Sequence, residues 1–220
     1  RGVPRIEEIL SLSASIKNPS LTVYLKEDEQ SDKDKANTLQ YMLEHTKLAE
    51  IVTSVSICFD PDDLNTLITE DTLTMSQYRD FENLVDECMG QELGQEENEK
   101  SKWIIRMEMD PEIMLEKNIT MDDIHFAINS SHGNDISCVY SDYNSSNLIF
   151  RVRMNSSVLN KTKKQKGIAK TLDQSDEIFL LRNFQDSLLN NIVLRGVSGI
   201  TNVLPRKVQN MVSRVDDKFV

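Results

Sequence analysis

A regular change in hydrophobic period runs through residues 103–200. Apolar side chains occupy every second position in some segments, as in strands with one buried face, and every third or fourth position in others, as in amphipathic helices. In chain order the segments are a strand at 103–109, a helix at 120–132, strands at 136–140 and 148–154, a helix at 172–190 and a strand at 192–197. The order β-α-β-β-α-β is typical of the split βαβ, or ferredoxin-like, arrangement. We therefore predict an α+β fold in which two helices cover one face of a four-stranded sheet.

The two predicted helices carry apolar stripes of the same spacing, as expected for helices that lie on one sheet. The stripes are Met121, Ile124 and Ile128 in the first helix and Leu181, Phe184 and Leu188 in the second. Thr120 and Asp123 have the spacing of a capping box, and Gly133 lies just beyond the expected helix end. Because this fold hosts many unrelated functions, the architecture alone assigns no activity.

The residues before 103 show the same two periods less regularly. The pattern predicts a helix at 4–16, a short strand at 21–25, a longer strand at 51–59 and a helix around 78–88. A polar and acidic stretch then continues to Lys102. We therefore divide the chain into a helix and strand portion at 1–60, a helix and acidic linker at 61–102, the ferredoxin-like domain at 103–200 and a C-terminal tail at 201–220.

The charge of the chain is strongly acidic. Its net charge of −11, from 25 basic and 36 acidic residues, argues against a general nucleic-acid binder, whose affinity would come mostly from Lys and Arg on phosphates. Basic residues nevertheless gather between 155 and 170 and near the C-terminus, where they can contact DNA or remain hydrated. These candidate DNA contacts are Lys161, Lys163, Lys164, Lys166, Lys170, Arg206, Lys207 and Arg214. No run of about 18 apolar residues occurs, so we expect no membrane partner.

The usual catalytic and metal-binding patterns are not found in the sequence. The histidines are scattered at His45, His125 and His132, and the cysteines Cys58, Cys88 and Cys138 have neither zinc-knuckle nor paired-disulfide spacing. The densest carboxylate group, Asp60-Pro61-Asp62-Asp63, has the composition of a turn at a strand end and is a weak candidate for Mg²⁺. We therefore expect no catalysis by this chain alone.

An RNA-recognition module is the obvious alternative for this fold, because such domains stack bases on aromatic residues of the central strands. The two central strands offer only Trp103 and Phe150, which alternate in phase with apolar neighbours and so should face the core. Arg106, Arg151 and Arg153 share the opposite, open face. A salt-bridged surface that includes Glu108 is favoured there over base stacking.

Three short motifs resemble one region of a known family. They are GVPRIEEIL at 2–10, PSLTVYL at 19–25 and LRGV at 194–197, with weaker similarity at WIIRMEMD, 103–110. Together they resemble the segment just after the trigger loop in the largest subunit of multisubunit DNA-dependent RNA polymerases, especially the RNA polymerase II type. The stretch 64–102 resembles the family only weakly. We therefore expect the chain to be a piece of a much larger protein, consistent with its start at Arg1.

The resemblance implies a non-catalytic portion of a DNA-directed RNA polymerase, a nucleotidyltransferase. Residues 103–200 would form the jaw domain, residues 1–60 a cleft portion, and the tail would return to the cleft. This portion would help to enclose downstream duplex DNA and to bind smaller subunits, including a zinc-ribbon subunit. The family holds Mg²⁺ in an Asp-Phe-Asp-Gly-Asp loop that this chain lacks, so no cofactor is expected here, although the parent enzyme would use magnesium. Its location would be the nucleus, or the cytoplasm for a large DNA virus.

The predicted sheet has two edge strands, at 136–140 and 192–197, and an exposed edge can accept a strand from a partner. We expect a small subunit to add a strand at the second edge. The candidate residues are Ile192, Val193, Leu194, Arg195 and Val197. An independent ferredoxin-like interaction module of another intracellular complex is the alternative, and an aspartate loop upstream of Arg1 would separate the two.

Overall fold

The structure is a computed structural model that describes residues 2–17, 19–63, 65–89, 100–155, 158, 174–208, 214–215 and 218–219. The chain divides into two compact units, residues 1–39 and residues 40–220. The division falls within a helix, α3 (Lys33–Leu43).

The first unit contains two further helices, α1 (Val3–Leu10) and α2 (Glu27–Gln30). Helix α1 begins with Pro4 in its first turn and ends earlier than the predicted residue 16, because Leu12 has a positive φ of 48° that breaks the helical path. Residues 21–25, predicted as a short strand, form no strand in the structure. The apolar side chains of α1 are all exposed, and none is buried within the unit.

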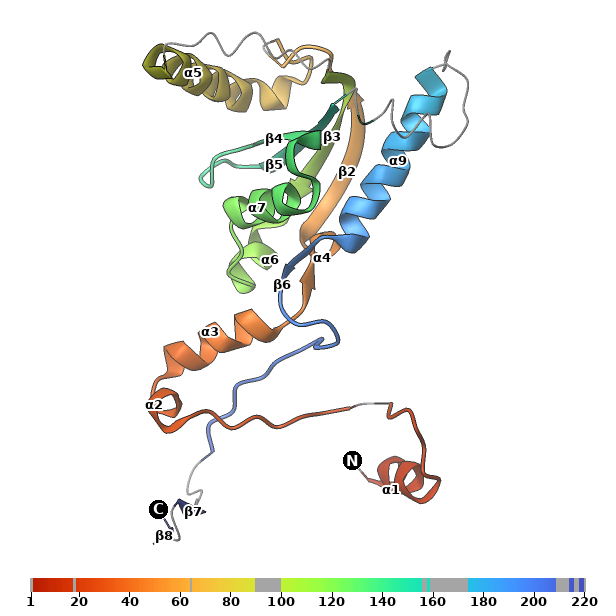
Figure 1. The fold of residues 1–220 in the computed structure, drawn as a ribbon, viewed down its shortest axis with the longest axis vertical. Coiled ribbons are helices and arrows are strands. Elements are labelled where there is room, and N and C mark those ends of the chain that lie inside the picture. The colour runs from red at the N-terminus through yellow and green to blue at the C-terminus, as the bar shows by residue number, and fades with distance from the viewer. Residues whose placement is uncertain are drawn as a thin grey trace. The chain divides into compact units, whose positions relative to one another are not determined.

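The second unit is built on a four-stranded antiparallel sheet, drawn in Figure 1. Its strands are β2 (Val52–Phe59), β3 (Lys100–Met109), β4 (Ile136–Tyr140) and β5 (Leu148–Asn155), in the spatial order β2-β3-β5-β4. The registers run from Val55↔Met107 to Phe59↔Trp103 between β2 and β3, and through Arg106↔Arg151 between β3 and β5.

Two helices cover one face of this sheet, as predicted, and the α+β, ferredoxin-like fold class is confirmed. They are α7 (Met121–His132) and α9 (Gln174–Asn191). Their stripes pack against the inward positions of the strands, and the fully buried centre includes Ile105, Met107, Phe150, Ile124 and Leu188. The predicted capping box starts α7, since the Thr120 hydroxyl accepts from Asp123 N at 3.2 Å and the Asp123 carboxylate accepts from Thr120 N at 3.0 Å.

The last predicted strand does not belong to the four-stranded sheet. Residues 192–197 contribute only the short strand β6 (Val193–Arg195), which pairs with β1 (Thr46–Lys47) in a separate two-stranded sheet. The edge next to β3 is occupied by β2 instead, whose eight residues match most of the length of β3. A strand of three residues that is followed at once by Gly196, where φ is 95°, cannot provide a ladder of that length.

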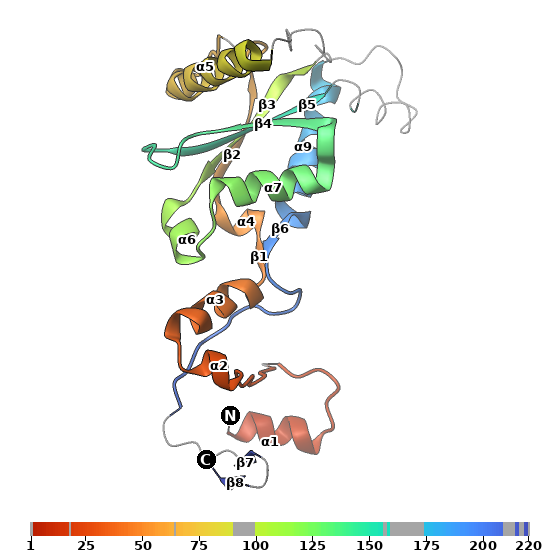
Figure 2. The same ribbon diagram turned by 60° about the vertical axis from the view of Figure 1, so that its left-hand side comes forward.

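The remaining elements lie outside the four-stranded sheet and its two covering helices. They are α4 (Leu48–Ile51), the 3₁₀ helix η1 (Thr69–Asp71), α5 (Thr72–Met89), α6 (Pro111–Glu116), the 3₁₀ helix η3 (Gly133–Asp135) and the paired strands β7 (Arg214–Val215) and β8 (Lys218–Phe219). Figures 1 and 2 place α5 across the sheet from α7. Among the helices of the described chain, none has the length and apolar character that crossing a bilayer requires.

Candidate functional site

A cluster of three arginines lies on the sheet face opposite α7 and α9. Arg106 comes from β3, and Arg151 and Arg153 come from β5, at positions that alternate with the core residues of those strands. The exposed fractions of the three residues are 8%, 3% and 4%. A buried guanidinium without a counter-charge is very unfavourable, so this face requires carboxylates.

Asp71 supplies the central carboxylate. It ends the 3₁₀ helix before α5, and its side chain is fully buried. It accepts from Arg106 Nε at 3.1 Å and from Arg151 Nη1 at 2.7 Å, so one carboxylate joins β3 to β5. Charge-assisted hydrogen bonds of this length are the stronger class in proteins. Asp71 therefore holds the start of α5 against the sheet.

Asp60 supplies a second fully buried carboxylate at the end of β2. It pairs with Arg151 Nη2, and it also accepts from Thr66 Oγ1 at 2.8 Å and from the backbone N of Leu67 at 3.1 Å. Burial opposes ionisation of this group, but the bonds from Arg151, Thr66 and Leu67 favour the charged form and together hold the pKa of Asp60 below its ordinary value. The Asp-Pro-Asp-Asp turn is thus fixed by an ion pair.

The other carboxylates that pair with the three arginines are more exposed than Asp60 and Asp71. The two terminal nitrogens of Arg106 donate to Glu70 at 2.8 Å and to Glu108 at 2.6 Å. Glu108 also accepts from Ser54 Oγ at 2.7 Å, and the bonds from Ser54 and Arg106 lower the pKa of the Glu108 carboxyl. Arg153 pairs with Asp63 and donates to the Ser101 carbonyl at 2.6 Å.

The expected pairing of Arg106 with Glu108 is confirmed, but the prediction of an open face is wrong. Residues 60–63, residues 65–71 and α5 cover the arginines, and four carboxylates that precede α5 supply most of their counter-charges. One feature of the sequence indicates that these arginines are covered. Three arginines at alternate positions of adjacent strands require nearby carboxylates, and the Asp-rich turn at 60–63 directly follows β2. The arrangement positions α5 and is chemically suited to structure rather than to reaction.

A second candidate region is the junction of β1 and β6, which contains the predicted edge residues. Leu48 N donates to Ile192 O at 3.1 Å, and Val197 N donates to Leu43 O at 3.1 Å, so residues 192–197 lie along residues 43–48. Gly196 is required at this crossing because a Cβ atom there would lie 2.1 Å from Glu44 O. The close approach accounts for the glycine of the LRGV motif.

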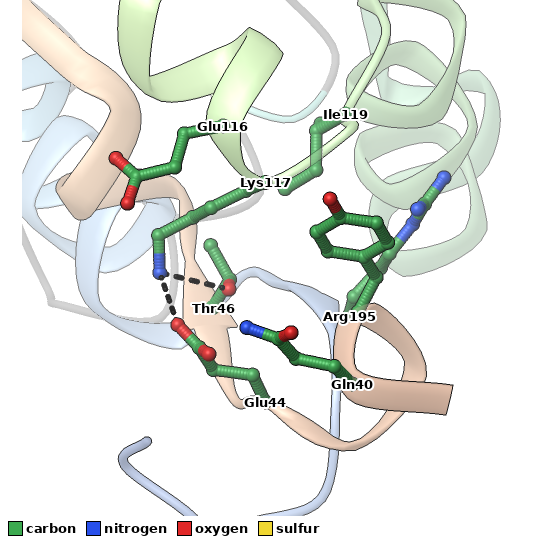
Figure 3. Close-up of a pocket in the computed structure, with 8 residues that line it drawn as sticks. Gln40, Glu44, Thr46, Glu116, Lys117, Ile119 and Arg195 are labelled. Carbon is green, nitrogen blue, oxygen red and sulfur yellow. Dashed lines mark hydrogen bonds and ion pairs between the residues drawn. The ribbon is translucent and has the colours of Figure 1, made fainter. Parts of the chain in front are cut away.

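A small polar pocket of about 40 Å³ opens beside this junction (Figure 3). Lys117 extends into it from the C-terminal end of α6 and donates to Glu44 at 3.2 Å, to Thr46 at 3.3 Å and to Glu50 at 3.3 Å. Burial disfavours the charged amine, but Glu44 and Glu50 raise the pKa of Lys117 above its ordinary value. Arg195, from β6, pairs with Asp123 at 2.7 Å. Both cations are thus neutralised, and the pocket has room for no more than a few water molecules.

The other predicted edge strand, 136–140, is confirmed as β4 at the end of the sheet. Its last residue, Tyr140, donates from its hydroxyl to Asp122 on α7 at 2.6 Å, and Tyr143 donates to the same carboxylate. The two hydroxyls lower the pKa of Asp122, and the bond to Asp122, followed by burial, raises the pKa of Tyr140 to about 12. These bonds fix the end of β4 on α7.

The candidate DNA contacts are only partly described. Lys161, Lys163, Lys164, Lys166 and Lys170 lie outside the described residues. Arg206 and Lys207 are exposed on irregular chain after β6, and Arg214 begins β7. Five of the eight candidate contacts thus have no described position, and DNA contact by this set stays a prediction.

Cysteines and histidines form no recognisable centre in the described part of the chain. Cys58 and Cys138 are half-buried, Cys88 is exposed on α5, and burial raises the pKa of the Cys138 thiol to about 12. His125 packs on Tyr140, and His132 packs on Phe184. Among the described residues, no group of three or more His, Cys, Asp or Glu side chains is placed to hold a metal ion.

One family model matches this chain, namely RNA polymerase Rpb1, domain 7, over residues 46–195. The matched range begins at β1 and ends at Arg195 of β6, so it contains the whole four-stranded sheet, the arginine cluster and both helices of the core. It spans well over half of the 220 residues. The chain therefore belongs to the RNA polymerase Rpb1, domain 7 family and is a segment of the largest subunit of a multisubunit DNA-directed RNA polymerase.

Proposed function

We propose that this segment is a non-catalytic jaw and cleft portion of the polymerase, which binds smaller subunits and helps to enclose downstream DNA. The observation that carries the proposal is the short strand β6, whose pairing with β1 leaves one side of its backbone without a strand partner among the described residues. An unpaired strand side offers hydrogen-bonding groups to an extended segment of a partner.

The backbone direction at β6 identifies the residues that would bind. Ile192 O accepts from Leu48 N, and the backbone groups of successive strand residues point to alternate sides. The amide of Val193 therefore points away from β1, whereas the register shifts before Arg195 pairs with Thr46, so alternation does not fix the direction of the Arg195 amide. The side chain of Val193 is also 43% exposed, which leaves room for a neighbouring strand.

Proline substitutions test this proposal directly. Val193→Pro removes an outward N–H, and Arg195→Pro removes an N–H at the irregular end of the same strand, so we expect each to weaken binding of the small subunit at least tenfold in a reconstituted complex. Val193→Ala keeps the amide and serves as the control for loss of the side chain. If the proline variants fold and bind the small subunits with unchanged affinity, strand addition at β6 is wrong.

DNA contact is the finer part of the proposal, and it rests on the exposed Arg206 and Lys207 together with the lysines between 161 and 170. Replacement of Arg206 and Lys207 by Gln should lower the affinity of the assembled polymerase for downstream duplex and reduce the slope of log affinity against log salt by about two. An unchanged salt slope would remove the DNA contact from the proposal.

In this proposal the catalytic magnesium of the parent enzyme is bound outside this segment. The carboxylates that lie together here face guanidinium groups, so they do not fit a hard cation that requires free oxygen ligands. The segment would act in the nucleus, or in the cytoplasm if the enzyme is that of a large DNA virus.

A further inference from the structure

Helix α5 exposes a stripe that carries three large apolar residues on the side that faces away from the sheet. Leu73, Phe81 and Leu84 are 69%, 63% and 59% exposed. At 100° per residue, these three positions, together with Gln77 and Cys88, fall within an arc of about 80°. Single exposed apolar residues are common on proteins, but a stripe along several turns of one helix is typical of a contact surface.

The opposite side of α5 is the one that is packed. Met75 is 2% exposed, and Tyr78 and Val85 are half-buried. The preceding residues Glu70 and Asp71 anchor the helix to the arginine cluster. The ion pairs of Glu70 and Asp71 therefore fix the start of α5 and the direction in which the stripe faces.

Charge indicates what can cover this stripe. Asp80 and Glu87 are exposed and lie within about 40° of one edge of the stripe, whereas Arg79, the single basic residue of α5, lies on the packed side. An acidic margin repels duplex DNA and anionic membranes. A second copy of α5 packed antiparallel would bring acidic margin against acidic margin, which is also unfavourable.

We propose that α5 is a docking surface for another subunit of the assembled polymerase, through a helix of that subunit with an apolar stripe edged by Lys or Arg. The stripe from Leu73 to Cys88 is about 22 Å long, so it matches a partner helix of about 15 residues. Its apolar residues would supply the affinity, and Asp80 and Glu87 would select a basic edge. This inference rests on membership in the polymerase and concerns a surface separate from β6.

Cys88 makes the proposal testable, because its exposed thiol lies within the stripe. We would measure the rate of N-ethylmaleimide labelling of Cys88 by peptide mass spectrometry, in this chain alone and in the assembled polymerase. We expect labelling to be at least tenfold slower in the assembly. A thiol-to-amine cross-linker placed on Cys88 should join it to a lysine of another subunit.

Variants separate docking from a general effect of assembly. Phe81→Ser with Leu84→Ser, or Asp80→Lys alone, should restore fast labelling of Cys88 in the assembly. Phe126→Ser changes a phenylalanine on α7 that is even more exposed than Phe81, 76% against 63%, and should have no effect. Unchanged labelling of the wild type in the assembly would overturn the proposal. Cross-links found only within this subunit, including to the lysines at 161–170, would also overturn it, whereas neither result would bear on strand addition at β6.

Discussion

Asp71→Asn should be the most damaging conservative substitution on the arginine cluster. The change keeps the shape of the side chain but removes a fully buried negative charge that accepts hydrogen bonds from Arg106 and Arg151. The asparagine oxygen can still accept one bond, but its amide group then faces a guanidinium, and both are donors. Two buried arginines therefore lose their shared negative charge at once.

The structure sets the size of this effect. Hydrogen bonds to charged groups contribute about 1.5–3 kcal/mol each, and removal of one partner of a buried ion pair costs about 3–5 kcal/mol. Since one bond can survive in the variant, we expect the free energy of unfolding to fall by about 3 kcal/mol. The neighbouring substitution Glu70→Gln is the matched control, because Glu70 binds the same Arg106 but its side chain is 63% exposed, and there the loss should be at most about 1 kcal/mol.

Urea unfolding followed by fluorescence of Trp103, the single tryptophan, measures both variants. Trp103 lies in β3 and packs against Phe59 of β2 with ring centroids 5.2 Å apart, so its signal reports on the sheet that carries the arginines. The midpoint should shift while the urea dependence stays constant. If Asp71→Asn and Glu70→Gln differ by less than about 1 kcal/mol, water reaches the cluster and the account of its buried charges is wrong.

Three further measurements test other parts of the structure. Gly196→Ala should destabilise the second unit by about 2–4 kcal/mol, because the new Cβ would lie 2.1 Å from Glu44 O. Gly199→Ala is the control and should cost about 1 kcal/mol, because Gly199 has a φ of 93° but no atom within 4 Å of the new Cβ. Equal losses of stability in urea unfolding would refute the close approach at Gly196. The pKa of Asp60 is lower in the folded chain than its ordinary 3.8, so the unfolded state takes up the proton first as the pH falls. The free energy of unfolding should therefore decrease as the pH drops below about 4. Asp60→Asn should make that decrease smaller when unfolding is measured over an acid titration. Cys88 should react with a maleimide at neutral pH on the order of 100-fold faster than Cys138, whose thiol has a pKa of about 12, and comparable rates would contradict the burial of β4.

Much of the second unit could be predicted because local patterns decide it. The alternation in β3, β4 and β5, the stripe of α7 and the Thr120–Asp123 box each depend on residues within one element, and all were correct. The membership in the polymerase family was likewise indicated by short motifs, and the family match confirmed it.

The partner of each strand was decided only by tertiary structure. The sequence predicted a strand at 51–59 and another at 192–197, but local pattern cannot say which of them pairs with β3. The eight-residue β2 offers a longer antiparallel ladder than the three-residue β6, so it takes the edge and β6 pairs with β1. Hydrogen bonding over the full length of a strand is a property of two segments together.

The burial of the arginines has the same origin. The alternation of β3 and β5 placed Arg106, Arg151 and Arg153 on one face, which the sequence by itself determined. Whether that face meets water depended on Asp60, Asp63, Glu70 and Asp71, which lie 35 to 91 residues away in the chain from the arginines they bind. Only the folded chain brings these carboxylates and guanidinium groups together. A buried ion pair depends on the surrounding packing, which excludes water from the carboxylate and from the guanidinium.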